Sequence, residues 1–228
     1  MKLIDIKKID EVNHKRVTFI RIEPNDLQQT LSDIILSLSD ISWINKFDEE
    51  FIRESFLSRV TPTIDDIKVK LLASSSDKVS SDAGEYVVSE LSRVAIKEHL
   101  NYYCIPLAEL FSKQRASNPG FDFYAENDCE TLIFGEAKYL SDKNAYGVGL
   151  GQIISFIEDK KDIKDIVDLQ LFFANSVLNN VKDGTKGFAV GFASKKISSD
   201  TLVSNILVNK DYIKLLNYHE IILIAVNI

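Results

Sequence analysis

The residues best suited to chemistry are Asp122, Glu136 and Lys138, which lie in two neighbouring segments of this 228-residue sequence. Asp122 ends the run Pro119-Gly120-Phe121-Asp122, and Glu136 and Lys138 follow an apolar run. Two carboxylates and an amine on adjacent strands can hold a divalent metal ion and a water molecule against a phosphodiester. Mg²⁺ or Mn²⁺ would suit such a site, because both ions favour oxygen ligands and retain water.

Each of these residues has an expected role in metal-assisted hydrolysis. Asp122 and Glu136 would be metal ligands, and the backbone carbonyl of Ala137 is a candidate for a further ligand. Metal-bound water loses a proton more readily, and the metal offsets charge on the attacked phosphate. Lys138 is expected to orient or deprotonate that water, or to stabilise negative charge in the transition state.

Whether the carboxylates share a face depends on how the two strands pair. Side chains alternate along a strand, so Glu136 and Lys138 project to one face. A reversal centred on Asp128 puts Asp122 opposite Phe134, on the same face as Glu136. A tight two-residue turn ending at Asp128 shifts the pairing by one residue and turns Asp122 away. The sequence leaves both pairings open, and the catalytic interpretation needs the first of them or a bulge.

The same residues also have ordinary structural interpretations. Asp122 follows Pro-Gly and could be a turn aspartate, and Glu136 with Lys138 could be a charge pair on an edge strand. Glu136, however, ends a strand that otherwise reads as buried, where a charge is costly unless it is paired or functional. We therefore favour the catalytic interpretation.

The elements that must position these residues follow from the apolar pattern. Strands are predicted over residues 16–23, 105–112, 121–125, 131–139, 187–194 and 220–226. Helices are predicted over residues 26–38, from the N-cap Asp82 to about residue 95, over 150–163 and over 200–208. Residues 43–72 and 167–176 remain ambiguous. This order predicts an α/β fold with a mixed central sheet flanked by helices.

Composition limits the class of protein. The Ser- and Asp-rich stretch 73–82 predicts a boundary between a small α+β accessory region, residues 1–80, and a second domain, residues 81–228. Two cysteines without C-x-x-C spacing and three isolated histidines argue against a disulfide framework and a zinc site. No apolar run has the length of a membrane span and no signal peptide is evident, so we expect a cytoplasmic protein.

The run Pro119-Gly120-Phe121-Asp122, followed after a gap by Glu136-Ala137-Lys138, resembles the motif of the PD-(D/E)XK nuclease superfamily. Gly120-Phe121 interrupts the Pro-Asp of that motif. The predicted order of elements between about residues 82 and 195 is also similar. The resemblance implies a restriction-endonuclease-like core and Mg²⁺-dependent phosphodiester hydrolysis, with Asp122, Glu136 and Lys138 as the catalytic set.

Within that superfamily, Gly84-Glu85, the Gly-Phe-Asp segment and the Phe-Gly-Glu-Ala-Lys strand resemble the nuclease subunits of bacterial anti-phage systems, most nearly those of Hachiman systems (HamA). Such nucleases act with a helicase. A helicase partner would suit this chain, because a net charge of −7 predicts that the protein alone binds DNA weakly.

Two further site residues are implied by the resemblance. Glu85 would add a metal ligand from the first helix of the domain, but it could equally complete a capping box with Asp82. Gln152 is the candidate for a substrate contact near the scissile phosphate, although its helical angle also fits a solvated side chain. The segment Gly147 to Gly151 is expected to form a flexible loop near the nucleic-acid backbone.

The substrate and the activity remain open at this point. Five basic residues could form a rim for nucleic acid or could be ordinary surface charges: Lys113, Arg115, Lys143, Lys195 and Lys196. DNA is the expected substrate. The alternative is a catalytically silent module with the same fold, which binds nucleic acid or a partner protein without cleaving. A coincidental Glu-x-Lys in an unrelated α/β domain is the third interpretation.

Overall fold

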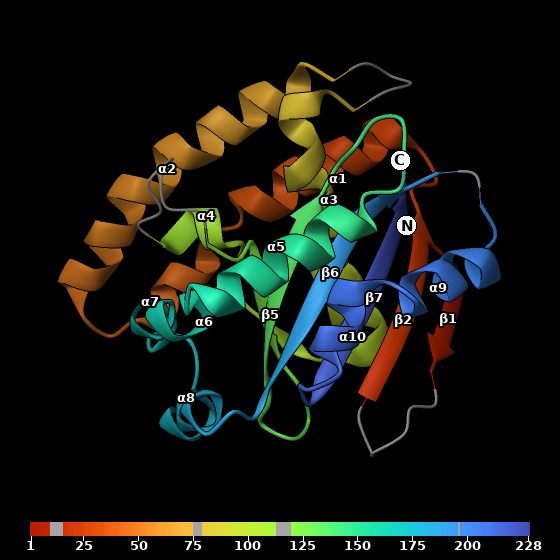
Figure 1. Ribbon diagram of the computed structural model, residues 1–228. Coiled ribbons are helices and arrows are strands. Elements are labelled where there is room, and N and C mark those ends of the chain that lie inside the picture. The colour runs from red at the N-terminus through yellow and green to blue at the C-terminus, as the bar shows by residue number, and fades with distance from the viewer. Residues whose placement is uncertain (10–15, 75–78, 113–119, 196) are drawn as a thin grey trace.

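The structure is a computed structural model that describes residues 1–9, 16–74, 79–112, 120–195 and 197–228 (Figure 1). Within these residues the chain forms one sheet of seven strands in the order β1-β2-β7-β6-β5-β4-β3. The strands are β1 (Lys2–Lys8), β2 (Arg16–Glu23), β3 (Tyr103–Cys104), β4 (Phe123–Glu126), β5 (Leu132–Lys138), β6 (Lys186–Ser194) and β7 (Glu220–Asn227).

The centre of the sheet is parallel and its margins are antiparallel. Strands β2, β7, β6 and β5 run parallel to one another, whereas β1 and β4 run against their neighbours. The parallel strands are buried on both faces, which explains why β7 reads as an almost continuous apolar run. The carboxyl ends of these parallel strands lie at the same end of the sheet, and Glu136 and Lys138 lie at that end of β5.

Helices cover both faces of the sheet (Figure 1). Helix α3 (Ser81–Leu100) packs on one face, and α1 (Leu27–Ser39) and α2 (Glu50–Leu72) pack against α3. On the opposite face lie α5 (Tyr146–Glu158), α9 (Ser199–Leu207) and α10 (Lys210–Leu215). The shorter helices are η1 (Ser42–Lys46), α4 (Ala108–Phe111), α6 (Lys161–Lys164), α7 (Ile166–Leu169) and α8 (Asn175–Lys182). The predicted mixed sheet with flanking helices is therefore confirmed.

The first two strands belong to the same sheet as the rest of the chain. Strand β2 pairs in parallel with the C-terminal strand β7, and β1 pairs with β2. The boundary predicted at residue 80 falls between α2 and α3 and does not divide the sheet. Strand β1 was not predicted, because its charged residues obscure the short apolar set Leu3, Ile4 and Ile6.

Three local predictions were wrong. Residues 105–112 are not a strand: Pro106 follows β3, and Leu107 and Leu110, buried and three residues apart, mark the turn of α4. The glycine segment 147–151 is part of helix α5 and not a flexible loop. The N-cap of α3 is Ser80, whose hydroxyl accepts a hydrogen bond from the Ala83 amide at 3.2 Å, so the predicted cap is displaced by two residues.

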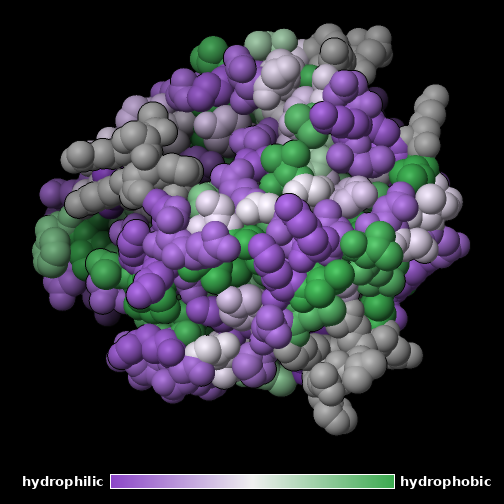
Figure 2. Space-filling model, in the orientation of Figure 1, coloured by the Kyte–Doolittle hydropathy of each residue, from purple (hydrophilic) through white to green (hydrophobic). Residues whose placement is uncertain are grey.

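None of the helices in the described ranges combines the length and the apolar composition that a membrane span requires. On the face shown in Figure 2, hydrophilic side chains cover most of the area and hydrophobic ones are interspersed among them. Isolated apolar side chains of this kind are normal on a protein surface.

Candidate active site

Lys138 joins two carboxylates at the carboxyl end of β5. Its ammonium nitrogen lies 2.8 Å from Oε1 of Glu136, two residues earlier on the same strand face. It lies 2.9 Å from Oε1 of Glu85, which projects from the first turns of α3. Glu85 therefore faces the sheet edge and its carboxylate binds Lys138, while the predicted capping box with Asp82 is absent because Ser80 caps the helix.

The pairing of β4 with β5 matches neither of the two pairings predicted. Phe123 pairs with Gly135, and the Asp122 amide donates to the Gly135 carbonyl at 2.8 Å. The connection between β4 and β5 is longer than expected, and this moves the pairing by two residues from the first predicted register. A shift of two leaves each β4 side chain on its predicted face. Asp122 itself comes just before β4 and is joined to β5 by its own amide.

The side chain of Asn127 sets the length of that connection. Its Oδ1 accepts hydrogen bonds from the amides of Cys129 and Thr131, at 2.8 and 2.9 Å. Glu130 takes a left-handed backbone conformation with φ of 54°, which closes the loop. Asn and Asp side chains that bind nearby backbone amides commonly build such turns.

The carboxylate of Asp122 is held at the edge of β5 by the backbone. Its Oδ2 accepts a hydrogen bond of 2.6 Å from the Ala137 amide. The amide and the carbonyl of one strand residue point to the same side of the strand, so the carbonyl of Ala137 is directed toward the Asp122 side. The predicted ligand pair of Asp122 and Ala137 is compatible with this arrangement.

A fourth carboxylate, Glu109, was not predicted. Glu109, Glu85 and Asp122 line a pocket of about 340 Å³ beside Tyr86 and Tyr139. Glu109 sits on the one-turn helix α4, which was mistaken for a strand. The spacing of Leu107 and Leu110 in the sequence is the signal that could have indicated a helical turn there.

Burial and neighbouring negative charges oppose ionisation of the carboxylates in this site. Burial raises the pKa of Glu136 to about 7 even though Lys138 lowers it. Burial, with the charge of Glu85, raises the pKa of Glu109 to about 7. Burial, with the charges of Glu136 and Glu109, raises the pKa of Asp122 well above its ordinary value. A bound cation would relieve this repulsion.

Two oxygens of the site also lack hydrogen-bond partners. Within the described part of the chain, Oε2 of Glu109 and Oε2 of Glu136 are buried without one. Burial lowers the pKa of Lys138, but the carboxylates of Glu136, Glu85 and Asp122 raise it by more, so the net shift is upward. Buried acceptors without partners are uncommon and often mark functional sites.

These side chains supply the right donors for a divalent cation but do not form a closed set of ligands. Among the described residues, no group of three or more His, Cys, Asp and Glu side chains is placed to hold a metal ion. The ammonium of Lys138 instead lies within ion-pair distance of both Glu85 and Glu136. Cation binding would therefore require these carboxylates to reorient about their side-chain bonds.

Helix α5 approaches the site through Gly149. A Cβ atom at Gly149 would lie 2.5 Å from Cγ2 of Val190 and 3.5 Å from Cγ of Lys138. Gln152 follows one turn later on α5 and is partly buried. Within the described residues its side chain forms no hydrogen bond to the four carboxylates, so its predicted role as a substrate contact stays a prediction.

We expect Gly149→Ala to destabilise the protein and Gly151→Ala to stabilise it. The added methyl at 149 clashes with Val190, which costs about 1 to 3 kcal/mol. At Gly151 the nearest atom is Oδ2 of Asp211, at an ordinary 3.6 Å, and alanine gains up to about 1 kcal/mol from helix propensity. Thermal melts of the two variants test this; equal effects would contradict close packing at Gly149.

Only part of the predicted basic rim can be located. Lys143 is exposed, and Lys195 donates to the carbonyl of Ile228 and lies 5.7 Å from the centre of the Tyr139 ring. Lys113, Arg115 and Lys196, like Pro119 of the motif, lie outside the described residues.

The chain was compared with known proteins at the level of sequence and of structure. No family model matches it, and neither does a curated protein or a solved structure. The proposal for its function therefore depends on the geometry and the electrostatics of this site.

Proposed function

We propose that this protein is a Mg²⁺- or Mn²⁺-dependent nuclease that hydrolyses phosphodiester bonds, with DNA as the expected substrate. The observation that carries the proposal is the position of Lys138, whose ammonium binds Glu85 and Glu136 beside a pocket lined by Asp122 and Glu109. Three carboxylates that line a small pocket, with Glu136 and the amine of Lys138 beside it, are donors of the kind that metal-assisted phosphodiester hydrolysis uses.

The residues that would hold the metal are Asp122, Glu136, Glu85 and the carbonyl of Ala137, with Glu109 as a further candidate. When bound, the metal ion would polarise the phosphate and make a bound water a better nucleophile. Metal binding would also provide partners for the buried oxygens of Glu109 and Glu136. The mutual repulsion of the carboxylates, which contributes to their raised pKa values, would be relieved by a bound cation.

Lys138 is better suited to electrostatic stabilisation than to proton abstraction. Its carboxylate neighbours hold its pKa above the ordinary value, so it stays charged at neutral pH. A charged ammonium at this position would stabilise negative charge on the phosphate and orient the attacking water. Deprotonation of the water by Lys138, the other role considered above, would require loss of that neighbouring charge.

The proposal extends to a restriction-endonuclease-like core and to a role in anti-phage defence. The order α3, β3, β4, β5, α5, β6 is compatible with the PD-(D/E)XK resemblance seen in the sequence. The net charge of −7 supports a partner, such as a helicase, that brings DNA to the site.

A nuclease assay on plasmid DNA tests the proposal. We expect nicking in the presence of Mg²⁺ or Mn²⁺ and none with EDTA, and Asp122→Asn should remove it. A parallel titration with Mn²⁺, followed by electron paramagnetic resonance, should show binding that Asp122→Asn and Glu136→Gln weaken about 10- to 100-fold. The assay is repeated with single-stranded DNA and RNA.

The second candidate function is a catalytically silent module of the same fold. It is favoured by the lack of a closed ligand set among the described residues. This alternative predicts no cleavage of any polymer and no Mn²⁺ binding that depends on Asp122 or Glu136. Absence of both would therefore replace the nuclease proposal.

A further inference from the structure

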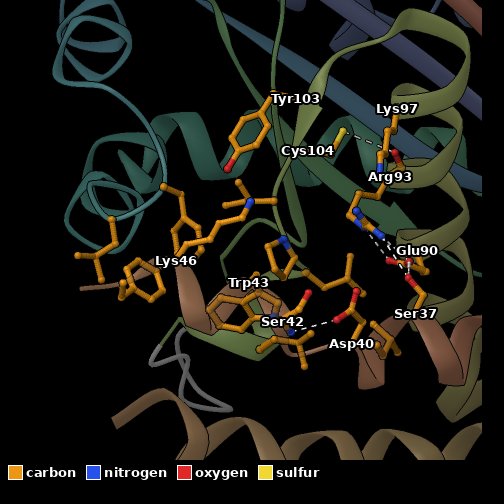
Figure 3. A pocket seen from close by; sticks show the side chains of 18 residues that line it. Ser37, Asp40, Ser42, Trp43, Lys46, Glu90, Arg93, Lys97, Tyr103 and Cys104 are labelled. Carbon is orange, nitrogen blue, oxygen red and sulfur yellow. Dashed lines mark hydrogen bonds and ion pairs between the residues drawn. The ribbon is translucent and has the colours of Figure 1, made fainter. Parts of the chain in front are cut away.

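A second pocket, of about 420 Å³, lies on the other side of α4 from the carboxylates. Leu107 and Leu110, which flank Glu109 in the sequence, line this second pocket, whereas Glu109 lines the first. Figure 3 shows the side chains around it, with Arg93 and Lys97 coming from α3 on one side and Lys46 from the opposite side. Its volume lies within the range of small-molecule sites.

The rim of this pocket has unbalanced positive charge. Within the described residues neither Lys46 nor Lys97 forms an ion pair, although Lys46 lies 6.0 Å from the centre of the Tyr103 ring. Arg93 differs, because Glu90 accepts hydrogen bonds from its Nη2 and Nε at 2.6 and 2.8 Å. Unpaired positive charge around a hollow favours an anionic ligand.

One carboxylate on the rim limits where an anion can sit. Asp40 accepts a hydrogen bond of 3.0 Å from the Ser42 amide, and its pKa is lowered by Ser42, so it is charged at neutral pH. The labelled side chains in Figure 3 place Asp40 and Ser42 away from Lys46 and Lys97. An anionic group is therefore expected between the two lysines, which approach the pocket from opposite sides, and away from Asp40.

The inner wall offers a surface for a planar ring. Trp43 and Phe172 line the pocket with ring centroids 5.7 Å apart, and Leu107 and Leu110 extend the apolar surface. Trp43, Leu107 and Leu110 are buried and form a packed floor, whereas Phe172 is only partly buried and presents the accessible aromatic surface. Aromatic side chains bind the flat faces of heterocyclic bases well.

We propose that this pocket binds a nucleotide, with its phosphate between Lys46 and Lys97 and its base against Phe172, beside Trp43. The two lysines supply the charge that a phosphate needs, and the aromatic wall supplies the apolar contact that inorganic anions cannot use. The nucleotide is either free or the end of a nucleic-acid strand; the same chemistry recognises both.

The pocket is also placed to influence the acidic site, an inference that rests on the proposed function. Helix α4 is shared by both pockets, and the Ala108 amide donates to the Asp122 carbonyl at 2.9 Å. A ligand in this pocket would therefore lie beside α4, the helix that contains Glu109 and is hydrogen-bonded to Asp122. We expect nucleotide binding to change the metal affinity of the site, since coupling between two ligands is reciprocal.

The single tryptophan of the chain makes binding directly observable, because Trp43 lines the pocket. Each of the four common nucleoside 5′-monophosphates is titrated into the full chain in EDTA, with inorganic phosphate in parallel. We expect a saturable change in tryptophan emission with at least one nucleotide. Lys46→Glu and Lys97→Glu should weaken binding at least roughly tenfold. Lys210→Glu, an equal charge change on α10 at the opposite face, should not.

Several results would overturn the proposal, and none depends on whether the protein cleaves DNA. These are no saturable response to any nucleotide, an equal response to phosphate alone, or an equal loss in Lys210→Glu. Melting curves confirm that the variants are folded. If a 5′-phosphorylated oligonucleotide binds at least tenfold tighter than the mononucleotide, the ligand is a strand end. If the mononucleotide binds at least tenfold tighter, the ligand is a free nucleotide.

The coupling has its own test. Mn²⁺ affinity is measured by electron paramagnetic resonance with and without nucleotide, in the wild type and in Lys97→Glu. Chelation of Mn²⁺ by the nucleotide affects both proteins equally, so a nucleotide effect confined to the wild type supports coupling through α4. If nucleotide changes the Mn²⁺ affinity equally in the two proteins, the coupling is overturned. Nucleotide binding itself is tested separately by the fluorescence titration.

Discussion

Glu136→Gln is expected to lower the rate of DNA cleavage at least about 10³-fold without destabilising the fold. Glutamine keeps the shape of the side chain and an acceptor for Lys138, but it removes the negative charge that would bind metal. Burial raises the pKa of Glu136 to about 7, which means that the fold favours the neutral form of this side chain. At pH 8 the melting temperature should therefore be equal to or higher than that of the wild type.

The combination of the two measurements separates catalysis from structure. If Glu136 served mainly as the ion-pair partner of Lys138, the variant would lose stability, and activity would fall only with it. Glu126→Gln on the neighbouring strand is the matched control, because it removes one partly exposed carboxylate on β4 and should keep the activity. Retained cleavage in Glu136→Gln would exclude the proposed metal site.

Much of the sheet was predictable because its strands carry their own pattern. Strand β2 begins at Arg16 and ends at Glu23 as predicted, and β5, β6 and β7 lie within a residue or two of the predicted bounds. These strands are buried runs rich in β-branched and aromatic residues. Such runs can be predicted as strands from their own sequence, with little information about the rest of the fold. The placement of Glu136 and Lys138 on one face followed from this regularity alone.

The pairing of Asp122 could not be predicted, because it depends on a loop. Asn127 binds two backbone amides, and Glu130 adopts a positive φ, so the loop is longer than the tight turns considered. Glu109 escaped notice for a related reason: a single helical turn after Pro106 has too few residues to show a helical period. Close packing accounts for Gly149 in helix α5 but not for Gly147 or Gly151, which have room for a methyl group.

Glu109→Gln is expected to make the protein more stable at pH 8 and to leave its stability unchanged near pH 4. In the unfolded chain Glu109 loses its proton near its ordinary pKa of 4.5, whereas in the folded chain it does so near 7. Between these values the folded state holds the proton more tightly, so ionisation costs stability as the pH rises. The full cost, reached above pH 7, is roughly 3 kcal/mol.

Glutamine cannot ionise and therefore avoids that cost. The melting temperature at pH 8 should rise by roughly 6 to 12 °C, measured by circular dichroism, and the gain should vanish at low pH. Glu98→Gln, which removes one exposed carboxylate from α3, is the control and should show no such pH dependence. Saturating Mn²⁺ should stabilise the wild type at pH 8 more than Glu109→Gln, because the variant has one carboxylate fewer for the cation. A loss of stability at both pH values would mean that Glu109 is a structural acceptor, and an equal Mn²⁺ effect would remove it from the metal site.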